Sequence, residues 1–467
     1  MKYYLTLFLS LLVSCSHEAA KVDQNLLTQE KYTSSDMKHV ALGEKITGDW
    51  WELFKSKELN ALIQEALQNN YSIAAAKSRL SQAEHAITSA QSQFWPQVDL
   101  EGGVAREKYG VALTGPTPTK IPVFSVYSLG PTASLPLDIF GKTRNDVKQQ
   151  TALAQYQYYE LQAAYLTLSA NVVTQVINLA VFNEQVQIVK ELIAYDQKYF
   201  NLMNASLQNG SATKLDLLAA ERQLNSDQSL LPTLEQQVAM AQHALAKLLG
   251  KTPASWVAPS ITLNNLKLPN KLPVALPSEL IHQRPDILAA EAQLHASNAA
   301  VDVAIANMFP SLSITGSLSQ QSLTLGSLFK SSSTAWGIAG NVLQPIFDGG
   351  LLEAKRKSAI DAEQATLAMY QQTILNAFCQ VADLLHAMDN DHESLDIQQR
   401  NMDLANSELN LANFKHNSGN SGILEVIQAK RINCNARLAL QRAIMQKYLD
   451  VTQLCLALGN PTALEHL

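Results

Sequence analysis

A long stretch of the chain repeats apolar residues every seven positions. One column of this pattern contains Tyr165, Val172, Leu179, Val186 and Ile193. Apolar residues at this spacing predict a helix that packs along another helix. No proline interrupts residues 141–204, so we expect a single helix roughly 96 Å long at about 1.5 Å per residue. A pair of soluble coiled-coil hairpins would explain this pattern equally well.

The same pattern returns later in the chain, which indicates a tandem duplication. Residues 215–222 match residues 424–431, an offset of 424 − 215 = 209. Each long helix is expected to turn, at Gly210 in one copy and near Gly419 in the other, and to be followed by a return helix. Pro232 lies inside the first return helix and predicts a kink there. The same offset carries the first apolar column onto Ile374, Val381, Met388, Leu395 and Met402.

Four shorter stretches alternate apolar with small or polar residues, which is the period of a β-strand. They lie at about 95–106, 122–137, 310–320 and 333–344. In the last of them, Trp336 and Ile338 alternate with Gly337 and Ala339. A half-buried soluble sheet would give the same alternation. Their length of about 9 to 11 residues, however, is that of a tilted strand in a membrane barrel.

Four strands are too few to close a barrel in a membrane, because unpaired strand edges are not tolerated in hydrocarbon. A dimer would supply eight strands and a bore filled by side chains, whereas a trimer supplies 3 × 4 = 12 and leaves room for water. The predicted fold is therefore mainly α with transmembrane β: duplicated long helical hairpins that form a helical barrel, and four strands per chain in a 12-stranded trimeric β-barrel. Aromatic residues near the strand ends fit the interfacial girdles of such a barrel, although several could equally anchor a core: Phe94, Trp95, Phe124, Phe309, Trp336 and Phe347.

The N-terminus has the composition of a targeting segment. Lys2 precedes an apolar run that ends in Leu12-Val13-Ser14-Cys15, which suits a signal peptide of residues 1–14. The run resembles the lipobox of bacterial lipoproteins, and this resemblance implies that Cys15 is acylated and becomes the mature N-terminus. A serine rather than an aspartate at position 16 is, in that family, the pattern of lipoproteins sent to the outer membrane. A secretory signal with a chance cysteine is the alternative.

Composition and motifs exclude several function classes. Charged residues make up 16% of the chain, and 35 Lys and Arg against 41 Asp and Glu give a net charge of −6, so a nucleic-acid partner is not expected. Gly141-Lys142-Thr143 lacks the glycine that a phosphate loop needs five positions earlier, where Pro136 stands. Glu291 and His295 share a helical face but have no further ligand motif. We therefore expect no enzyme activity, no cofactor and no metal site, and we expect the cysteines after Cys15 simply to pack.

Several short motifs in a fixed order resemble the TolC-like outer-membrane efflux proteins, within them the lipoprotein (NodT-type) branch. The resemblance covers nearly the whole mature length. It implies a homotrimer in the outer membrane, with a 12-stranded barrel and a long periplasmic α-barrel that docks to an inner-membrane pump of the resistance-nodulation-division (RND) class through a periplasmic adaptor. The motifs are Trp50-Trp51 with Phe54, Leu59, Leu62, Ala66-Leu67 and Asn70, Leu135 to Gly141, Arg284-Pro285-Asp286-Ile287 with Ala290-Glu291, Phe309 to Gly316, and Pro345 to Gly350.

In that family the periplasmic end is closed at rest by residues just beyond the helical turns. The corresponding residues here are Leu215, Asp216, Leu424, Glu425 and Gln428. The relatives carry an aspartate where Gln428 stands, so we hypothesise that Asp216 and Glu425 supply the charge instead. Three chains would present 3 × 2 = 6 carboxylates and favour cations. The alternative is that Asp216 only caps its own helix.

The sequence predicts an exit duct rather than a catalyst. We expect a signal peptide at 1–14, a lipid-anchored extension at 15–43, repeats at 44–250 and 278–459 joined by a proline-rich linker at 251–277, and a tail at 460–467. The predicted function is the outer-membrane channel of a tripartite efflux system that passively exports small molecules. A lipid-anchored periplasmic scaffold and the channel of a type I secretion system are the alternatives. The sequence does not name the cargo.

Overall fold

The computed structural model describes residues 22, 28, 31–32, 40–43, 49–108, 122–259, 261–269 and 272–459. The predicted signal peptide, Cys15 and the predicted C-terminal tail lie outside these residues. The described chain divides into two compact units. The sheet unit takes in residues 79–157 and 290–370, and the helical unit takes in residues 40–78, 158–289 and 371–459. Each unit draws on both sequence copies, so the compact units differ from the repeats expected from the sequence.

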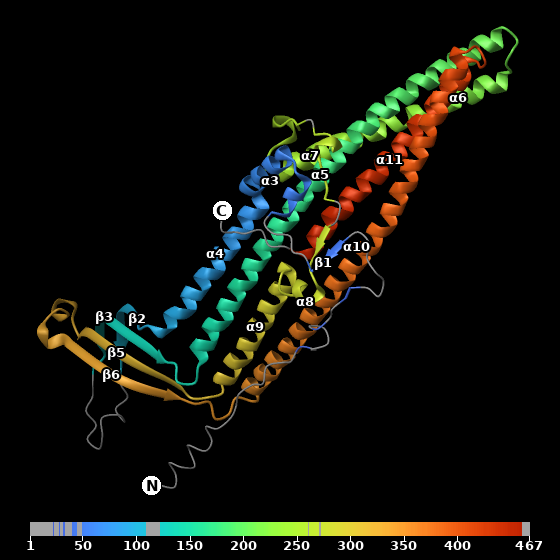
Figure 1. The fold of residues 1–467 in the computed structure, drawn as a ribbon. Coiled ribbons are helices and arrows are strands. Elements are labelled where there is room, and N and C mark those ends of the chain that lie inside the picture. The colour runs from blue at the N-terminus through green and yellow to red at the C-terminus, as the bar shows by residue number, and fades with distance from the viewer. Residues whose placement is uncertain are drawn as a thin grey trace. The chain divides into compact units, whose positions relative to one another are not determined.

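Two helices of equal length carry the duplication. Helix α5 (Lys142–Gln208) and helix α10 (Leu351–Asn417) each have 67 residues and stand out as the longest ribbons in Figure 1. They begin 351 − 142 = 209 residues apart and end 417 − 208 = 209 residues apart. At about 1.5 Å per residue each helix is roughly 100 Å long, as the uninterrupted periodicity predicts.

The two return helices differ where Pro232 stands. The first is split into α6 (Lys214–Gln228) and α7 (Leu230–Leu248), whereas its counterpart α11 (Ile423–Leu458) runs unbroken for 36 residues. Proline has no N–H to donate to the carbonyl four residues earlier, and its ring crowds that carbonyl. The predicted break is confirmed, and it falls just before the proline.

The remaining helical elements are shorter and lie before α5 or between α7 and α10. Their bounds are η1 (Trp50–Phe54), α3 (Lys57–Asn69), α4 (Tyr71–Gln91), η2 (Ser92–Phe94), η4 (Pro253–Ser255), η5 (Leu263–Asn265), α8 (Pro277–Leu280), α9 (Pro285–Ala306), η6 (Leu325–Ser327) and η7 (Ser331–Ser333). A short parallel pair joins β1 (Val40–Leu42) to β4 (Leu272–Val274), so the segment before the first repeat is hydrogen-bonded to the linker.

A four-stranded antiparallel sheet forms the centre of the sheet unit. Its strands are β2 (Gln97–Glu107), β3 (Phe124–Leu137), β5 (Ser311–Ser322) and β6 (Thr334–Leu343), in the order β2-β3-β5-β6. The central pair, β3 with β5, joins the two sequence copies and aligns Leu135 with Ile314. The cross-copy pairing explains why one compact unit holds strands of both repeats.

The seven-residue columns form the core of the helical unit. Val172 and Leu179 of α5 are at most 4% exposed, and so are Ile374 and Val381 of α10. Helix α5 contains an 18-residue window apolar enough by composition to cross a membrane, but 67% of that window is buried inside the protein. The apolar residues of α5 therefore serve packing.

The three cysteines of the described chain have different surroundings. Cys434 packs with Ile188 and Leu192 of α5, and Cys455 is 2% exposed. Burial raises the pKa of Cys434 to about 11 and that of Cys455 to about 12, so both thiols stay protonated and unreactive. Cys379 is exposed. In the single chain the expectation that the cysteines pack is therefore wrong for Cys379.

Candidate channel wall and gate

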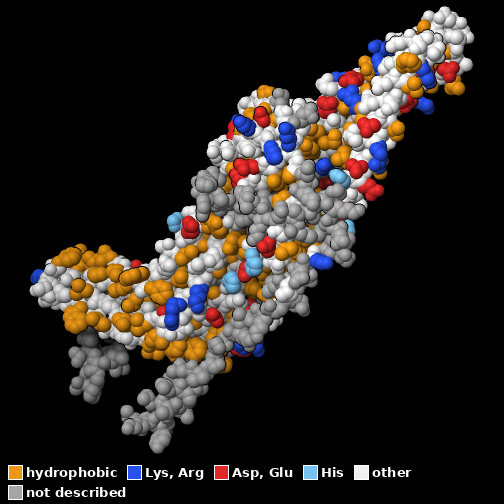
Figure 2. All heavy atoms as spheres, viewed as in Figure 1, with side chains coloured by type: hydrophobic (Ala, Val, Ile, Leu, Met, Phe, Trp, Pro, Cys, Tyr) orange, Lys and Arg blue, Asp and Glu red, His pale blue; other side chains and the backbone are white. Residues whose placement is uncertain are grey.

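One face of the sheet is apolar and open to the surroundings. Leu318 lies opposite Trp336, and Gly316 lies opposite Ile338, which puts these side chains on the same face. Trp336 and Ile338 are both 75% exposed. In Figure 2 hydrophobic side chains gather over the strands, while acidic and basic side chains are spread over the helices. A large exposed apolar face of this kind is suited to lipid.

The opposite face carries small and polar side chains. Thr315 lies opposite Ala339, and Ser317 lies opposite Gly337. The Asn341 amide donates a hydrogen bond to the Thr315 hydroxyl, with 3.2 Å between Nδ2 and Oγ1. The alternation predicted from the sequence is therefore confirmed as two distinct faces. A polar face opposite a lipid-facing one is the wall of a water-filled barrel.

The outer strands of this sheet leave two unpaired edges. Among the described residues, β2 pairs only with β3, and β6 pairs only with β5. Three successive antiparallel steps make β2 and β6 antiparallel to each other. The β6 edge of one chain therefore has the direction needed to pair with the β2 edge of a second chain. Repeating this pairing around a threefold axis closes twelve strands without an exposed edge.

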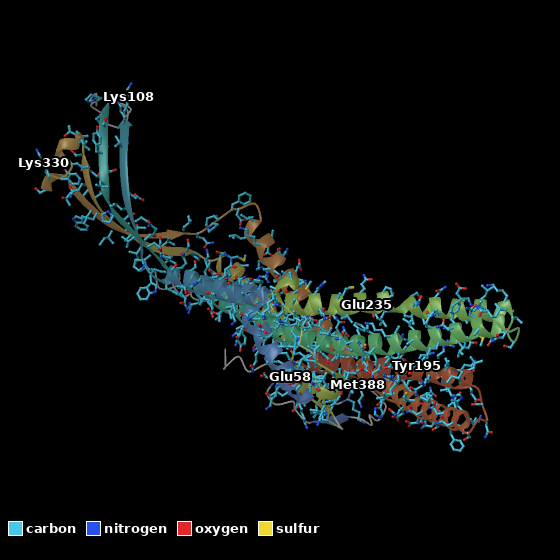
Figure 3. All side chains as sticks on the ribbon, turned by 90° about the horizontal axis from the view of Figure 1, so that it is seen from above. Glu58, Lys108, Tyr195, Glu235, Lys330 and Met388 are labelled. Carbon is cyan, nitrogen blue, oxygen red and sulfur yellow. The ribbon has the colours of Figure 1, made fainter. Side chains whose placement is uncertain are left out.

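The strand length agrees with a membrane span. Strand β2 has 11 residues, which at about 3.3 Å per residue and a tilt of about 45° cover roughly 25 Å of membrane thickness. Lys108 and Lys330 lie at the loop end of the sheet in Figure 3, beyond the strands. Charged side chains are thus placed where the span ends and water begins.

The aromatic residues predicted as girdles flank the strands at both ends. Trp95 precedes β2 and Phe347 follows β6; both are exposed, at 72% and 92%. At the loop end, Phe124 is the first residue of β3, and Trp336 is near the start of β6. Phe309 stacks on Phe140 with 5.0 Å between ring centroids. This contact agrees with the alternative that Phe309 anchors local packing rather than an interfacial girdle. Phe94 is 40% exposed.

The turns of the two helical hairpins have the same backbone geometry. Gly210 and Gly419 both have φ +72° and are 419 − 210 = 209 residues apart. In the first turn the N–H of Ser211 donates to the carbonyl of Ser206 at 2.8 Å, and in the second the N–H of Asn420 donates to that of Lys415 at 2.8 Å. Left-handed glycine with these bonds is a standard helix end. Both copies therefore present the residues after the turn in the same way.

The two acids predicted at the gate have different partners. Asp216 accepts hydrogen bonds from the hydroxyl and the backbone N–H of Thr213, at 2.7 and 2.9 Å. These bonds hold the pKa of the Asp216 carboxyl below its ordinary value. Glu425 instead lies 3.1 Å from the ammonium of Lys415. Asp216 thus caps its own helix, and the charge of Glu425 is partly balanced across the turn.

The other residues predicted at the gate also differ in exposure. Leu424 packs against a cluster formed by Met203, Leu217 and Ala220, so it joins the second hairpin to the first. Leu215 is 75% exposed, and Gln428 is exposed as well. The structure therefore brings Leu424 onto the other copy and leaves Leu215 and Gln428 uncovered in the single chain.

An uncovered apolar stripe on α10 was not among the sequence predictions. Ile397, Leu404 and Leu411 recur every seven residues and are 41%, 69% and 54% exposed. The seven-residue spacing would have revealed this stripe, because a helix with a second apolar column needs a second neighbouring helix. Among the described residues of the single chain, no helix covers that side of α10.

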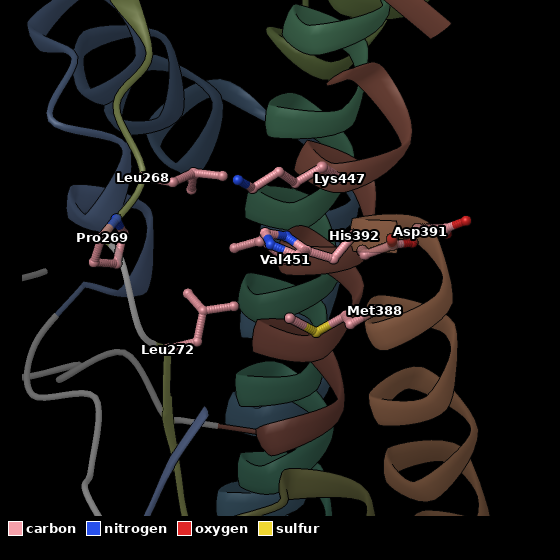
Figure 4. A pocket seen from close by; sticks show the side chains of 9 residues that line it. Leu268, Pro269, Leu272, Met388, Asp391, His392, Lys447 and Val451 are labelled. Atoms are coloured by element: carbon pink, nitrogen blue, oxygen red, sulfur yellow. The ribbon is translucent and has the colours of Figure 1, made fainter. Parts of the chain in front are cut away.

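Two pairs of acidic residues, each with at least one buried member, were also missed. Asp196 of α5 and Asp227 of α6 meet Arg431 of α11. Asp450 of α11 meets Asp391 of α10. The second pair borders a cavity of about 330 Å³ whose walls include Leu268, Met388, His392, Lys447 and Val451 (Figure 4). No residue spacing in the sequence predicts either pair, because the members of each pair lie on different helices.

The described part of the chain contains no group of three or more histidine, cysteine or acidic side chains that could hold a metal ion. Glu291 and His295, the pair noted in the sequence, are 4.0 Å apart and largely exposed. A two-faced sheet with open edges and, in the other unit, two long helical hairpins are the features of a subunit of an outer-membrane channel.

Comparison with known proteins identifies the family. The profile of the family described as "Outer membrane efflux protein" matches residues 62–251 and 276–460, and the chain belongs to this family. It is 30% identical over 416 residues to the cation efflux system protein CusC of Escherichia coli K12, covering 88% of each chain. It is 28% identical over 428 residues to the pyoverdine export outer membrane protein OpmQ of Pseudomonas aeruginosa, covering 90% of this chain and 88% of OpmQ.

A solved structure has the same fold. The outer-membrane channel OprN superposes with a TM-score of 0.81 at 25% identity, over 96% of this chain and 97% of that one. The predicted family and fold class are confirmed: this chain is one subunit of a trimeric outer-membrane efflux channel, with a helical part in the periplasm. The family is one of channels rather than enzymes.

Proposed function

We propose that this chain is the outlet of a tripartite efflux system whose inner-membrane pump is of the RND class and is joined to the channel by a periplasmic adaptor. The observation that carries the proposal is the two-faced sheet with unpaired β2 and β6 edges, which only further chains can close. The duct provides passage, and the pump selects the cargo. One of the relatives named above is a pyoverdine export protein and the other is a protein of a cation efflux system. Such different cargoes agree with a duct that does not select its cargo.

Two experiments test this proposal. Purified protein in a planar bilayer should give channels; their persistent absence would favour a periplasmic scaffold. In the source bacterium, deleting this channel and deleting the pump should each sensitise cells to the same compounds, and the double deletion should add nothing. Additive sensitivities would mean that the channel serves a different pump, and loss of protein secretion alone would favour a type I system.

We propose that Cys15 carries the lipid anchor. The apolar run and the Leu-Val-Ser-Cys motif support this assignment, and several acyl chains at about 0.8 kcal/mol per buried methylene hold a protein at a membrane. Mass spectrometry of the mature N-terminus should find an acylated cysteine. Cys15→Ser should leave the channel in the periplasm or poorly assembled. An unmodified N-terminus upstream or downstream of Cys15 would refute the assignment.

The periplasmic gate is proposed to consist of Leu215, Asp216, Leu424, Glu425 and Gln428. All five follow the two glycine turns, which have the same geometry in both copies. Within this set we expect Asp216 to contribute more to cation preference than Glu425, because the bonds from Thr213 keep the Asp216 carboxyl ionised, whereas the charge of Glu425 is partly balanced by Lys415. Single-channel reversal potentials of Glu425→Gln and Asp216→Asn separate the two. Unchanged cation preference in the double variant would end the idea of an acidic gate.

A further inference from the structure

A buried ion triad ties the first hairpin of the helical unit to the second. The guanidinium of Arg431 on α11 forms an ion pair with the carboxylate of Asp196 on α5, and its Nη2 lies 3.9 Å from Oδ2 of Asp227 on α6. Gln223, one turn before Asp227, donates to the same Oδ2 at 2.9 Å. Asp196 is 1% exposed and Asp227 is 8% exposed. Three helices from both sequence copies therefore meet at one guanidinium.

The triad has two carboxyl groups for one positive charge. Burial and a hydrogen bond with Asp227 raise the pKa of Asp196 to about 7, against the opposing effect of Arg431. With one proton on the pair the triad is neutral, and without it a net negative charge is buried, which is costly. A further titratable group in electrostatic contact with Asp196 is the thiol of Cys434 on α11, which stays protonated.

The triad stands at the base of the predicted gate. Asp227 is the second-last residue of α6, next to the break that precedes Pro232. The other end of α6 carries Leu215 and Asp216, about 16 Å away at 1.5 Å per residue. On α11, Arg431 follows Gln428 by 431 − 428 = 3 residues, which is nearly one helical turn. One guanidinium thus connects both helices that carry gate residues.

We propose that Arg431, Asp196 and Asp227 form a latch that sets the spacing between α6 and α11, and that its hold depends on one proton shared by the two aspartates. This inference rests on the proposed gate. It adds three residues that position the two helices on which the gate residues lie. Breaking a buried pair leaves an uncompensated charge, whereas breaking an exposed pair costs little. Breaking the latch should therefore cost more free energy than breaking the exposed contacts of Arg437 on α11 with Glu184 and Glu191 on α5.

The direction of the pH dependence follows from proton uptake. When α6 and α11 separate, Asp196 enters water, where an aspartate has a pKa of about 3.9. Between about pH 4 and pH 7 the latched state therefore binds more protons than the released state. Raising the pH through this range favours release, by at most about tenfold per pH unit, and the effect levels off above about pH 7.

Single-channel recording of the purified full-length protein at about pH 5 and about pH 8 tests the latch. Wild-type channels should open more often at the higher pH. Asp227→Asn keeps a hydrogen-bonding partner but removes the second acid, so its opening should be low and independent of pH over this range. Arg431→Met removes the positive charge that holds the two aspartates and should open about tenfold or more above wild type at pH 8. Arg437→Met is the matched control and should keep the wild-type profile.

The distance between spin labels on α6 and α11 tests the latch independently of channel conductance. Spin labels are placed at two exposed positions, Glu221→Cys on α6 and Asn435→Cys on α11. The exposed native thiol is removed by Cys379→Ser, whereas Cys434 and Cys455 are buried and stay unlabelled. The label distance should lengthen with pH in the wild-type background and stay constant with Asp227→Asn. A wild-type pH profile in Asp227→Asn, or equal effects of Arg431→Met and Arg437→Met, would overturn the latch. Absence of channels with a pH-dependent label distance would instead count against the proposed function alone.

Discussion

The backbone N–H of Thr213 donates a hydrogen bond to the carboxylate of Asp216 at 2.9 Å, and the Thr213 hydroxyl accepts one from the N–H of Asp216 at 3.3 Å. This reciprocal pair closes the start of α6. At the equivalent place in the second copy, 213 + 209 = 422, stands Gly422, which offers no side-chain cap to α11. The duplicated hairpins thus share their turn but differ in how their return helices begin.

Removing the cap hydroxyl should loosen the start of α6. Thr213→Ala leaves backbone N–H groups of the first turn without their side-chain acceptor, and loss of such a cap costs about 1 kcal/mol. Hydrogen exchange in the first turn of α6 should quicken about fivefold, with no change at the start of α11. Ser226→Ala, at an exposed position of the same helix, is the control. Equal exchange in both variants would mean that the cap contributes nothing measurable.

Gly250 should tolerate no side chain. It has φ +71°, and a Cβ built there would lie 2.5 Å from the carbonyl oxygen of Asn69. Gly419 has nearly the same φ but nothing within 4 Å of its Cβ position. Gly419→Ala should therefore cost only the left-handed strain, about 1 kcal/mol, whereas Gly250→Ala should cost clearly more. Chemical denaturation of the two variants compares them; equal losses would contradict the close approach of the Asn69 carbonyl.

Arg284 should be one of the most sensitive charged residues of the helical unit. Its guanidinium bonds Asp286 at 2.7 Å, Gln380 at 3.0 Å and the carbonyl of Ala457 at 2.8 Å, and the residue is 8% exposed. Arg284→Met leaves these groups without their donor and should destabilise the unit by about 3 kcal/mol. Lys190→Met removes an exposed pair with Glu235 and should cost less than about 1 kcal/mol. The difference in midpoint of thermal unfolding measures the contrast.

Local patterns account for what could be predicted from the sequence. The seven-residue column through Val172 and the period-two alternation around Ile338 are set by helix and strand geometry, and both specify the observed faces. The break before Pro232 follows from one missing donor. The Asp196–Asp227–Arg431 triad could not be predicted in this way, because its members come from three helices and no single helix shows their spacing. The stacking of Phe309 on Phe140 likewise depends on tertiary packing.

Replacing Asp450 should change how stability varies with pH. Burial and a hydrogen bond with Asp391 raise the pKa of Asp450 to about 7, above the value of about 3.9 in an unfolded chain. The folded state then binds more protons between these values, so wild-type stability falls as the pH rises from about 4 to 7. Asp450→Asn resembles the protonated form and keeps a partner for Gln446, which donates to Asp450 at 2.9 Å.

The variant should therefore be more stable than wild type at pH 8, by on the order of 2 kcal/mol, and close to wild type at pH 5. Denaturant unfolding at both pH values measures this difference. Asp383→Asn, at an exposed position of α10, is the control variant and should leave the pH dependence of stability as it is in wild type. If the free energies of unfolding of Asp450→Asn and wild type changed with pH in parallel, the pair of Asp450 and Asp391 would not titrate in this range.

Two neighbouring residues of β6 offer a direct test of which face of the sheet meets lipid. Ile338 is on the apolar face, opposite Gly316, and Ala339 is on the polar face, opposite Thr315. Both lie near the middle of the strand, where an arginine facing lipid costs about 2–4 kcal/mol per chain, whereas an arginine facing water costs far less. Ile338→Arg should therefore reduce the yield of assembled trimer strongly, and Ala339→Arg should leave assembly intact.

Both variants add the same charge at adjacent positions, so general effects on expression or charge cancel in the comparison. Ala339→Arg should in addition lower the cation preference of the assembled channel, because three guanidinium groups would then face the water of the lumen. Trimer yield in detergent extracts and reversal potentials in bilayers measure the two effects. If Ile338→Arg assembled normally and Ala339→Arg did not, the lipid and water faces would be exchanged, and a closed barrel with the polar face inward would be impossible.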